Sequence, residues 1–314
     1  NIIIANRFQL VTYLADGGQG EVWEALDLKT NQHVALKLVP EDNTTDLTTE
    51  YDFYDKLQQR RSTGMLQVLF FTEQLDEYAI LALPLLGPNL LDLFHYCGDQ
   101  FSLKTVLLIA DQVLQRLRFL HSQDIIHRDI KPANLMMGRG IDGNTIYLVD
   151  YGLARDKVQA PDDPLHYGLD LEANVVGTTD YASKAAHRMQ CDVGQTYRDD
   201  MESFGYMMVE FLTGSLPWNE LRASSNRSRA EKVGEAKETI ALDDLCQDVP
   251  NVFKEYFKHV RNLRYNERPD YARLRKLFRS EFQRRGYKYN HVYDWTEELF
   301  REVNLKAAGA ANSA

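Results

Sequence analysis

The sequence predicts an α+β protein in which a small antiparallel β-rich lobe with one main helix precedes a larger, mainly helical lobe. Two observations support this prediction. Up to residue 83, short segments rich in β-branched and aromatic residues alternate with turn-forming stretches, as in an antiparallel meander. From residue 90 onward, apolar residues recur at helical spacing. With 314 residues, of which 44% are hydrophobic, the chain can bury one large core or two adjoining ones.

The elements of the small lobe follow in chain order. The predicted strands are residues 8–14, 20–26, 33–39, 68–71 and 78–83. After the third strand the apolar period becomes helical over residues 45–61, where Leu47, Tyr51, Tyr54 and Leu57 share one face. This is the main helix expected in the small lobe.

The large lobe is predicted to consist of helices joined by turns. These helices lie near residues 90–97, 103–121, 200–213, 250–263 and 271–283. No internal repeat is visible, and the two prolines within residues 161–164 indicate a loop. We therefore expect residues 1–87 to form the small lobe and a hinge, residues 88–300 the large lobe, and residues 301–314 a flexible tail.

Composition excludes several classes of protein. Cys97, Cys191 and Cys246 are far apart and in no paired spacing, which argues against a disulfide framework and a zinc site and favours a reducing compartment. The apolar run at residues 1–5 is too short for a signal sequence or a spanning helix, and no later run reaches membrane length. We expect a soluble protein with no membrane partner, in the cytoplasm and also in the nucleus.

The run His-Arg-Asp-Ile-Lys-Pro-Ala-Asn at residues 127–134, followed by Asp150, holds the charged groups that phosphoryl transfer requires. Asp129 can accept the proton of an acceptor hydroxyl, and Lys131 can neutralise charge on the transferred group. Asn134 and Asp150 can hold Mg²⁺, because carboxylate and amide oxygens suit a hard cation. An isolated His-Arg-Asp would instead indicate a polar turn capped by Asp129, but the whole pattern favours catalysis.

Residues before this run are typical of a site for nucleotide phosphates. The glycines between the first two strands allow backbone N–H groups to approach phosphate oxygens, although in isolation a glycine-rich hairpin turn is the commoner explanation. Lys37 can grip the α- and β-phosphates, and Glu50 is placed to pair with it. In the predicted hinge, Pro84 keeps its carbonyl as an acceptor for an adenine amine, and the Leu86 N–H can donate back. The predicted ATP-binding residues are Ala15, Gly17, Gly18, Gly20, Val22, Ala35, Lys37, Glu50, Leu83, Pro84, Leu86 and Leu135.

Five longer motifs carry a resemblance to a known family. They are Leu-Leu-Gly-Pro-Asn-Leu at 85–90, Phe-Ser-Leu-Lys-Thr-Val-Leu-Leu at 101–108, Arg-Asp-Asp-Met-Glu-Ser-Phe-Gly-Tyr at 198–206, Gly-Ser-Leu-Pro-Trp at 214–218 and Arg-Pro-Asp-Tyr at 268–271. On these motifs the chain resembles eukaryotic protein kinases, and among them the casein kinase I family, from about residue 8 to residue 295. Like that family, it has Ser-Lys-Ala at 183–185 where most kinases have Ala-Pro-Glu.

The resemblance implies a monomeric serine/threonine kinase that transfers the γ-phosphoryl group of ATP, with Mg²⁺, to protein substrates. It also implies that no activation-loop phosphorylation is needed, and we expect no nucleic-acid partner. Thr178 would line the substrate floor near Asp129, and Asp200 would anchor the catalytic loop from below. From the residues alone, Asp200 can equally be an N-cap or an acid in the first turn of a helix.

The chain departs from the family at several positions. Ala15 replaces the first glycine of the glycine-rich loop, and Tyr151 replaces the usual Phe of the metal motif, where we expect little effect on activity. Casein kinases I are typically basic and favour acidic or phosphorylated substrates, whereas this chain has a formal charge of −10. Asp180 stands where the family usually has an anion-binding arginine. The preference for acidic substrates is therefore expected to be weak.

The segment between residues 151 and 182 is itself acidic. Its acids are Asp156, Asp162, Asp163, Asp170, Glu172 and Asp180, and its bases are Arg155 and Lys157. It can simply be a solvated loop. A basic stretch can still face the substrate, and its members are Arg222, Arg227, Arg229 and Lys232.

Two other functions remain open on sequence alone, because fold does not decide function. One is a scaffold that keeps the fold without catalysis. The complete set of predicted catalytic residues argues against it, namely Lys37, Glu50, Asp129, Lys131, Asn134 and Asp150. The other is a small-molecule phosphotransferase, and the floor at residues 177–181 argues instead for a polypeptide substrate.

Overall fold

The computed structural model of the chain describes residues 2–17, 20–40, 44–75, 77–157, 175–189 and 194–311. Several predictions lie outside these residues: those for Gly18, Cys191, the loop at 161–164 and the acids Asp162, Asp163, Asp170 and Glu172.

The chain divides into two compact units. The sheet unit contains Asn1–Pro88 and Asn134–Ala154, and the helical unit contains Asn89–Ala133 and Arg155–Ala314. The second segment belongs to the sheet unit because its backbone bonds there: the Gly87 N–H donates to the Met137 carbonyl at 2.8 Å, and the Leu148 N–H donates to the Gly64 carbonyl at 3.1 Å. A division into two consecutive lobes after residue 87 therefore leaves out this returning segment.

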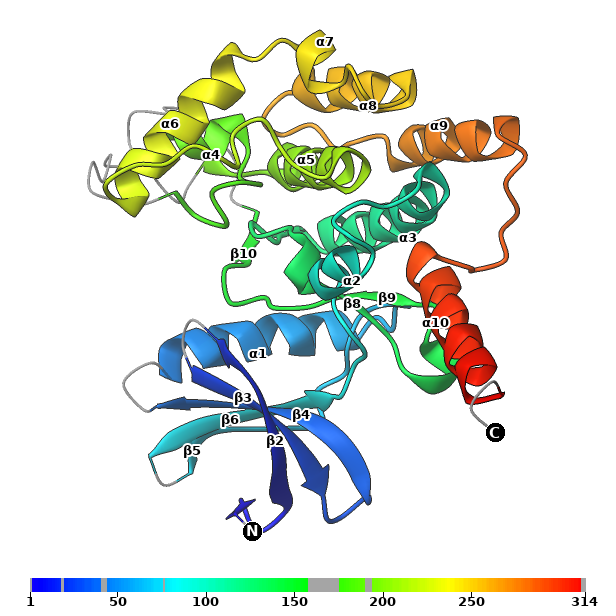
Figure 1. The fold of residues 1–314 in the computed structure, drawn as a ribbon. Coiled ribbons are helices and arrows are strands. Elements are labelled where there is room, and N and C mark those ends of the chain that lie inside the picture. Colours follow the sequence, from blue (N-terminus) through cyan, green and yellow to red (C-terminus); the bar gives the residue numbers. More distant parts are fainter. Residues whose placement is uncertain are drawn as a thin grey trace. The chain divides into compact units, whose positions relative to one another are not determined.

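The sheet unit is built on an antiparallel sheet, as the sequence predicts (Figure 1). Its strands are β1 (Ile3–Ile4), β2 (Phe8–Gly17), β3 (Gly20–Asp27), β4 (Gln32–Pro40), β5 (Phe70–Leu75) and β6 (Tyr78–Pro84), in the order β1-β2-β3-β4-β6-β5. Alternate residues of β4, Val34, Leu36 and Leu38, are buried in one core with Phe8 and Ile80. Because side chains alternate along a strand, Lys37 lies on the other face of the sheet.

Helix α1 (Thr44–Gln58) packs against β4, β5 and β6 (Figure 1). It ends three residues earlier than the apolar period predicts, before Arg61, whose φ is +41°. The following strand begins at Phe70 rather than Val68, because the Val68 N–H donates to the Gln58 side chain at 2.9 Å instead of to a neighbouring strand. A separate two-stranded sheet of this unit joins β8 (Leu135–Met137) to β9 (Ile146–Leu148).

The helical unit contains the long helices that the sequence predicts. They are α2 (Leu90–Tyr96), α3 (Leu103–Ser122), α5 (Tyr197–Thr213), α8 (Asn251–Arg261) and α9 (Tyr271–Arg284). Side-chain caps start several of them: Ser102 accepts from the Thr105 N–H at the start of α3, and Asp270 accepts from the Arg273 N–H at the start of α9. Helices α3 and α9 lie side by side, as do α5 and α8 (Figure 1).

Further elements of this unit were not predicted. They are α4 (Lys184–Met189), α6 (Asn226–Thr239), α7 (Leu242–Leu245), α10 (Asp294–Ala311) and a short pair of strands, β7 (Ile125–Ile126) and β10 (Arg155–Asp156). The prediction of a flexible tail from residue 301 differs from the structure, in which α10 continues to Ala311. The reason is local: leucine, lysine and alanine dominate residues 305–308, and these residues favour helix.

Two simpler expectations can be compared with the described part of the chain. Cys97 and Cys246 are both free thiols there. None of the helices in the described ranges combines the length and the apolar character that crossing a membrane requires.

Candidate active site

The predicted site residues fall into two groups, one in each unit. Lys37, Glu50, Asn134 and Asp150 belong to the sheet unit, together with the glycine-rich turn and the hinge. Asp129, Lys131, Thr178 and Asp200 belong to the helical unit.

The predicted ion pair of the sheet unit is present. Lys37 Nζ on β4 lies 2.6 Å from Glu50 Oε2 on α1, and the Glu50 side chain is only 3% exposed. Burial raises the pKa of Glu50, and the nearby Asp150 adds to this effect, while the Lys37 ammonium opposes it. The pair therefore holds Lys37 in one place at the cost of desolvating a carboxylate.

Asp150, a predicted Mg²⁺ ligand in the sheet unit, has a left-handed backbone conformation, with φ +67°. Its N–H donates to the Tyr54 hydroxyl of α1 at 3.1 Å. The next residue, Tyr151, is fully buried and packs edge-on against the Tyr54 ring at 4.8 Å. Its hydroxyl donates to the Leu148 carbonyl at 3.2 Å and lies 3.2 Å from Met65 Sδ. The Tyr151 hydroxyl, which the usual Phe at this position lacks, therefore has protein partners.

The β8–β9 hairpin brings Asn134 close to Asp150, although the two are far apart in sequence. Leu135 pairs with Leu148, and the Val149 N–H donates to the Asn134 carbonyl at 3.0 Å. Asn134, which precedes β8, and Asp150, which follows β9, therefore lie at the same end of the hairpin. One carboxylate and one amide oxygen form a donor set that suits Mg²⁺, which usually takes its other ligands from water and phosphate. Leu135 itself is fully buried.

The glycine-rich turn joins β2 to β3. Gly17 pairs with Gly20, and Ala15 pairs with Val22 across the hairpin. A Cβ on Gly20 would lie 2.2 Å from the Leu38 carbonyl oxygen, so this glycine is needed for packing against β4. Ala15, in contrast, is exposed.

The predicted hinge begins at Pro84, the last residue of β6. Leu83 pairs with Ala35 and Pro84 pairs with Val34, so the strand order places these residues beside β4. After Leu86, the backbone bonds to β8 on both sides: Gly87 donates to Met137, and Met137 donates to the Pro88 carbonyl at 2.9 Å. The segment after β6 is therefore tied to the hairpin that precedes Asp150.

In the helical unit, Asp129 is held by two side chains. Its Oδ1 accepts from the N–H and the hydroxyl of Thr178, at 2.8 and 2.7 Å, and its Oδ2 lies 2.6 Å from Lys131 Nζ. Burial by itself would raise the pKa of Asp129, but the Lys131 ammonium and the hydrogen bonds from Lys131 and Thr178 outweigh it and lower this pKa below its ordinary value. The carboxylate is thus ionised and oriented, as a base must be.

Asp200 anchors the catalytic loop, as the family resemblance implied. Its two oxygens accept from the backbone N–H groups of His127 and Arg128, both at 2.8 Å, and it also bonds His121 Nε2 at 2.8 Å. Arg128 has φ +69°, so these bonds hold a strained backbone. The N-cap interpretation is wrong, because Thr196 is the N-cap of α5. Asp200 does lie in the first turn.

Gly177 brings the substrate floor against the catalytic loop. Its φ is +93°, and a Cβ there would lie 2.4 Å from the Arg128 carbonyl oxygen. Thr178 follows directly and reaches Asp129. Glycine at this position therefore allows the close approach on which the Thr178 bonds depend.

Asp180 does not present an unpaired carboxylate. Its Oδ1 accepts from Arg229 Nη2 of α6 at 2.8 Å, with both side chains a little over one-quarter exposed. Two other members of the predicted basic stretch also have partners: Arg227 lies 3.5 Å from Glu231, and Lys232 donates to the Arg222 carbonyl at 3.0 Å. The charge at Asp180 is thus balanced within the chain.

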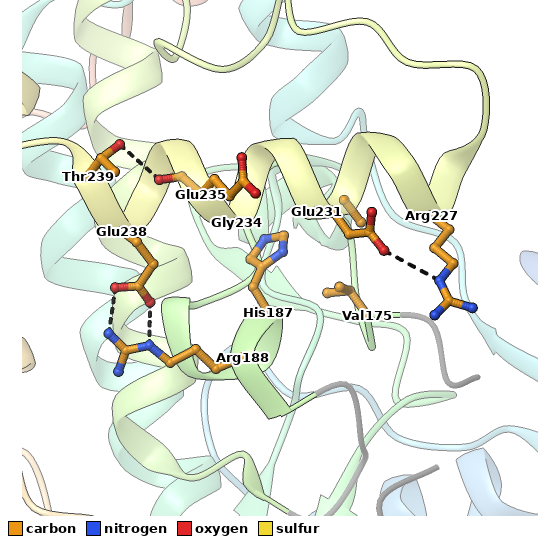
Figure 2. A pocket seen from close by; sticks show the side chains of 10 residues that line it. Val175, His187, Arg188, Arg227, Glu231, Gly234, Glu235, Glu238 and Thr239 are labelled. Carbon is orange, nitrogen blue, oxygen red and sulfur yellow. Dashed lines mark hydrogen bonds and ion pairs between the residues drawn. The ribbon is translucent and has the colours of Figure 1, made fainter. Parts of the chain in front are cut away.

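A pocket of about 430 Å³ in the helical unit was not expected from the sequence. It lies between α4 and α6, as Figure 2 shows, and His187 projects into the space between them. The lining residues are Val175, His187, Arg188, Arg227, Ala230, Glu231, Gly234, Glu235, Glu238 and Thr239. None of the predicted site residues is among them, so this pocket is separate from the nucleotide-binding residues proposed above.

Sequence reasoning also missed Lys237, the buried lysine of α6. The buried positions of this helix are Ala230, Val233, Gly234 and Lys237, so its inner face contains small and charged residues instead of a stripe of large apolar ones. The periodicity that revealed the other helices was absent here.

Comparison with known families identifies the domain to which both groups of residues belong. The family model of the protein kinase domain matches residues 8–277, which cover most of the chain and include every predicted catalytic residue. An antiparallel sheet unit and a helical unit are the two parts of that fold. The chain therefore belongs to the protein kinase domain family and is a phosphotransferase with protein substrates.

Proposed function

We propose that this kinase is a serine/threonine kinase of the casein kinase I type, which uses ATP and Mg²⁺ and acts as a monomer. The observation that carries the proposal is the state of Asp129, whose carboxylate is buried, ionised and held by Lys131 and Thr178. A carboxylate in this state suits the acceptance of a proton from an aliphatic hydroxyl.

Each predicted site residue of the helical unit then has a separate role. Asp129 accepts the hydroxyl proton as the acceptor oxygen bonds to the γ-phosphorus of ATP, and the bond from this phosphorus to the β,γ-bridging oxygen breaks, so that ADP leaves. Lys131 neutralises negative charge that develops on the transferred group. Thr178 keeps Oδ1 of Asp129 engaged, and Asp200 fixes the backbone of the loop that carries Asp129.

The sheet unit supplies the residues that would hold the nucleotide. Lys37, positioned by Glu50, would bind the α- and β-phosphates, while Asn134 and Asp150 would hold Mg²⁺. When bound, ATP supplies the phosphoryl group and Mg²⁺ reduces the charge repulsion around it. The backbone of Pro84 and Leu86 would orient the adenine.

The choice of serine and threonine over tyrosine rests on the family resemblance. Ser183, Lys184 and Ala185 stand where most kinases have Ala-Pro-Glu, as in casein kinase I. Here the Ser183 hydroxyl donates to the buried Asp199 at 2.5 Å, so this segment has its own anchor to α5. This contact supports a floor of the casein kinase I type.

The test measures transfer of labelled phosphate from ATP to casein and to three matched peptides that differ only in a Ser, Thr or Tyr acceptor. We expect Mg²⁺-dependent labelling of casein and of the Ser and Thr peptides, with none after chelation of the metal and labelling at least about a hundredfold slower with Asp129→Asn. Labelling of the Tyr peptide alone would reject serine/threonine specificity. A protein that binds ATP but labels no acceptor would be an inactive scaffold.

A further inference from the structure

Lys237 of α6 lies in an unusual environment for a lysine. Its side chain is fully buried. The ammonium donates to the backbone carbonyls of Thr179 at 2.8 Å and of Ala182 at 2.7 Å. The rings of Tyr206 and Trp218 each lie 5.0 Å from it, a distance that allows cation–π attraction. Burying an ammonium group costs desolvation free energy. A buried lysine with these partners therefore indicates a specific role.

The carbonyls that Lys237 binds lie in the substrate floor, residues 177–181, and directly after it. The Thr178 carbonyl accepts from the N–H groups of Tyr181 and Ala182, both at 2.9 Å, which closes the segment into a turn. Between the two carbonyls bound by Lys237, the Asp180 carbonyl accepts from Trp218 Nε1 at 2.9 Å. Three carbonyls of a short loop are thus satisfied by two buried side chains.

A neutral histidine, His187, also lies beside Lys237. His187 Nε2 lies 3.2 Å from Lys237 Nζ and 3.3 Å from the Thr179 carbonyl oxygen. Figure 2 shows His187 extending from α4 towards α6 beside Gly234. A Cβ on Gly234 would lie 3.1 Å from the His187 side chain, so the glycine makes room for the ring. Burial, followed by the charge of Lys237, lowers the pKa of His187 to about 4.

We propose that Lys237 is a positioning residue for the phosphoryl acceptor: it holds the backbone of the substrate floor so that Thr178 stays bonded to Asp129. These contacts connect α6 to the catalytic loop without a break. Lys237 bonds the carbonyls of Thr179 and Ala182, and the neighbouring Thr178 bonds Asp129. This inference rests on the proposed function, in which a protein hydroxyl approaches Asp129 above this floor.

The protonation of Lys237 provides a signature of this role. Burial lowers its pKa to about 7; Glu202 on α5 and Asp180 on the floor oppose this effect, and Arg229 on α6 adds to it. His187 on α4 is neutral at this pH, and the Tyr206 hydroxyl is bonded to Glu202. Below pH 7 the ammonium donates with full charge, and above pH 7 the neutral amine donates more weakly. The hydrogen bonds from Lys237 to the Thr179 and Ala182 carbonyls should therefore weaken as pH rises through about 7.

The experiment compares the wild type with Lys237→Met and with Lys258→Met, which removes an exposed lysine from α8. In Lys237→Met we expect amide hydrogen exchange in residues 175–189 to accelerate at least tenfold, the KM for a peptide substrate to rise about tenfold, and the KM for ATP to stay unchanged. Lys258→Met should match the wild type in all three. Unchanged exchange and unchanged peptide KM in a folded Lys237→Met would overturn the proposal.

Lys237→Arg provides a second measurement should the Met variant not fold. Its guanidinium stays charged at all accessible pH values. We expect the peptide KM of the wild type to rise between pH 6 and pH 8, and that of Lys237→Arg to stay flat. The same rise in both proteins would overturn the proposal. A wild type that phosphorylates no acceptor would reject the proposed function, while hydrogen exchange would still decide whether Lys237 holds the floor.

Discussion

Thr178 donates both its backbone N–H and its hydroxyl to a single oxygen of Asp129, at 2.8 and 2.7 Å. The proposed substrate floor therefore also orients Asp129, the proposed base. One half of this arrangement depends on the backbone and the other on the side chain, so a substitution at Thr178 can separate them.

Thr178→Val removes the hydroxyl donor and keeps the shape and the backbone N–H. A hydrogen bond to a charged group is worth about 1.5–3 kcal/mol, so we expect kcat/KM for a peptide to fall by about tenfold to a hundredfold. Thr178 helps lower the pKa of Asp129, so its loss should raise that pKa and shift the acid limb of the pH–rate profile to higher pH. Thr178→Ser, measured in parallel, should keep the wild-type profile. Identical profiles for Val and Ser would exclude the hydroxyl from the mechanism.

Asp129→Asn should reduce kcat by about 10²- to 10⁴-fold, because a positioned general base typically contributes that much. Affinity for ATP should stay nearly unchanged, since the substitution alters the group proposed to contact the acceptor hydroxyl. Steady-state kinetics and nucleotide titration of the same preparation measure both quantities. A near-normal kcat would remove Asp129 from its proposed role.

Lys37→Met should abolish phosphoryl transfer and also destabilise the protein, by about 3–5 kcal/mol at neutral pH, because Glu50 is left buried without its partner. The sign of the pH dependence follows from Glu50. Its pKa in the folded state is raised by burial, so the folded protein binds the proton more tightly than the unfolded chain. The stability of the variant should therefore decrease as pH rises from about 5 to 8.

The double variant Lys37→Met/Glu50→Gln separates stability from activity. It removes the buried charge, so denaturant unfolding should show much of the lost stability restored and little dependence on pH, while activity stays absent. A double variant as unstable as Lys37→Met would mean that packing of the lysine stem, and not the carboxylate, causes the loss.

Tyr151→Phe restores the usual family residue and removes a hydroxyl that bonds the Leu148 carbonyl. We expect the free energy of unfolding to fall by about 0.5–1.5 kcal/mol, with kcat and both KM values within twofold of the wild type. Denaturant unfolding and steady-state kinetics test the two statements separately. A large loss of activity at unchanged stability would show that the hydroxyl acts on Asp150.

Asp180→Asn should release Arg229 from its ion pair. Because both side chains are partly exposed, the pair is worth about 0.2–1 kcal/mol, and the freed guanidinium should improve kcat/KM for a phosphorylated peptide up to about fivefold over its unphosphorylated match. The gain should shrink at high salt and vanish in Asp180→Asn/Arg229→Gln. A gain that survives the second substitution would assign the effect to another base.

Much of the sheet unit and its site could be predicted from the sequence, because local patterns carry the information. Strands β3, β4 and β6 lie within one residue of their predicted ends, and the Lys37–Glu50 pair is confirmed. Where boundaries differ, a side chain competes with the backbone. Gln58 takes the N–H of Val68 and so delays β5, an interaction that no periodicity reveals.

The helical unit shows where such reasoning stops. Helix α6 escaped prediction because its buried face includes Gly234 and Lys237, residues that normally indicate a turn or a solvated surface. The ion pair of Asp180 was not predicted either, because its partner, Arg229, is 49 residues away in sequence. Both features depend on polar contacts made across the fold, which require three-dimensional placement and leave no local pattern.

Gly20 bears on how sequences of related chains should be interpreted. The Leu38 carbonyl of the neighbouring strand leaves no room for a Cβ at this position, whether or not a nucleotide is bound. A descendant that lost catalysis would still be under selection to keep glycine there, simply in order to fold. Retention of Gly20 is thus no diagnostic of a working enzyme. Loss of the Asp150 carboxylate, whose proposed role lies in the reaction, would reveal such a change first.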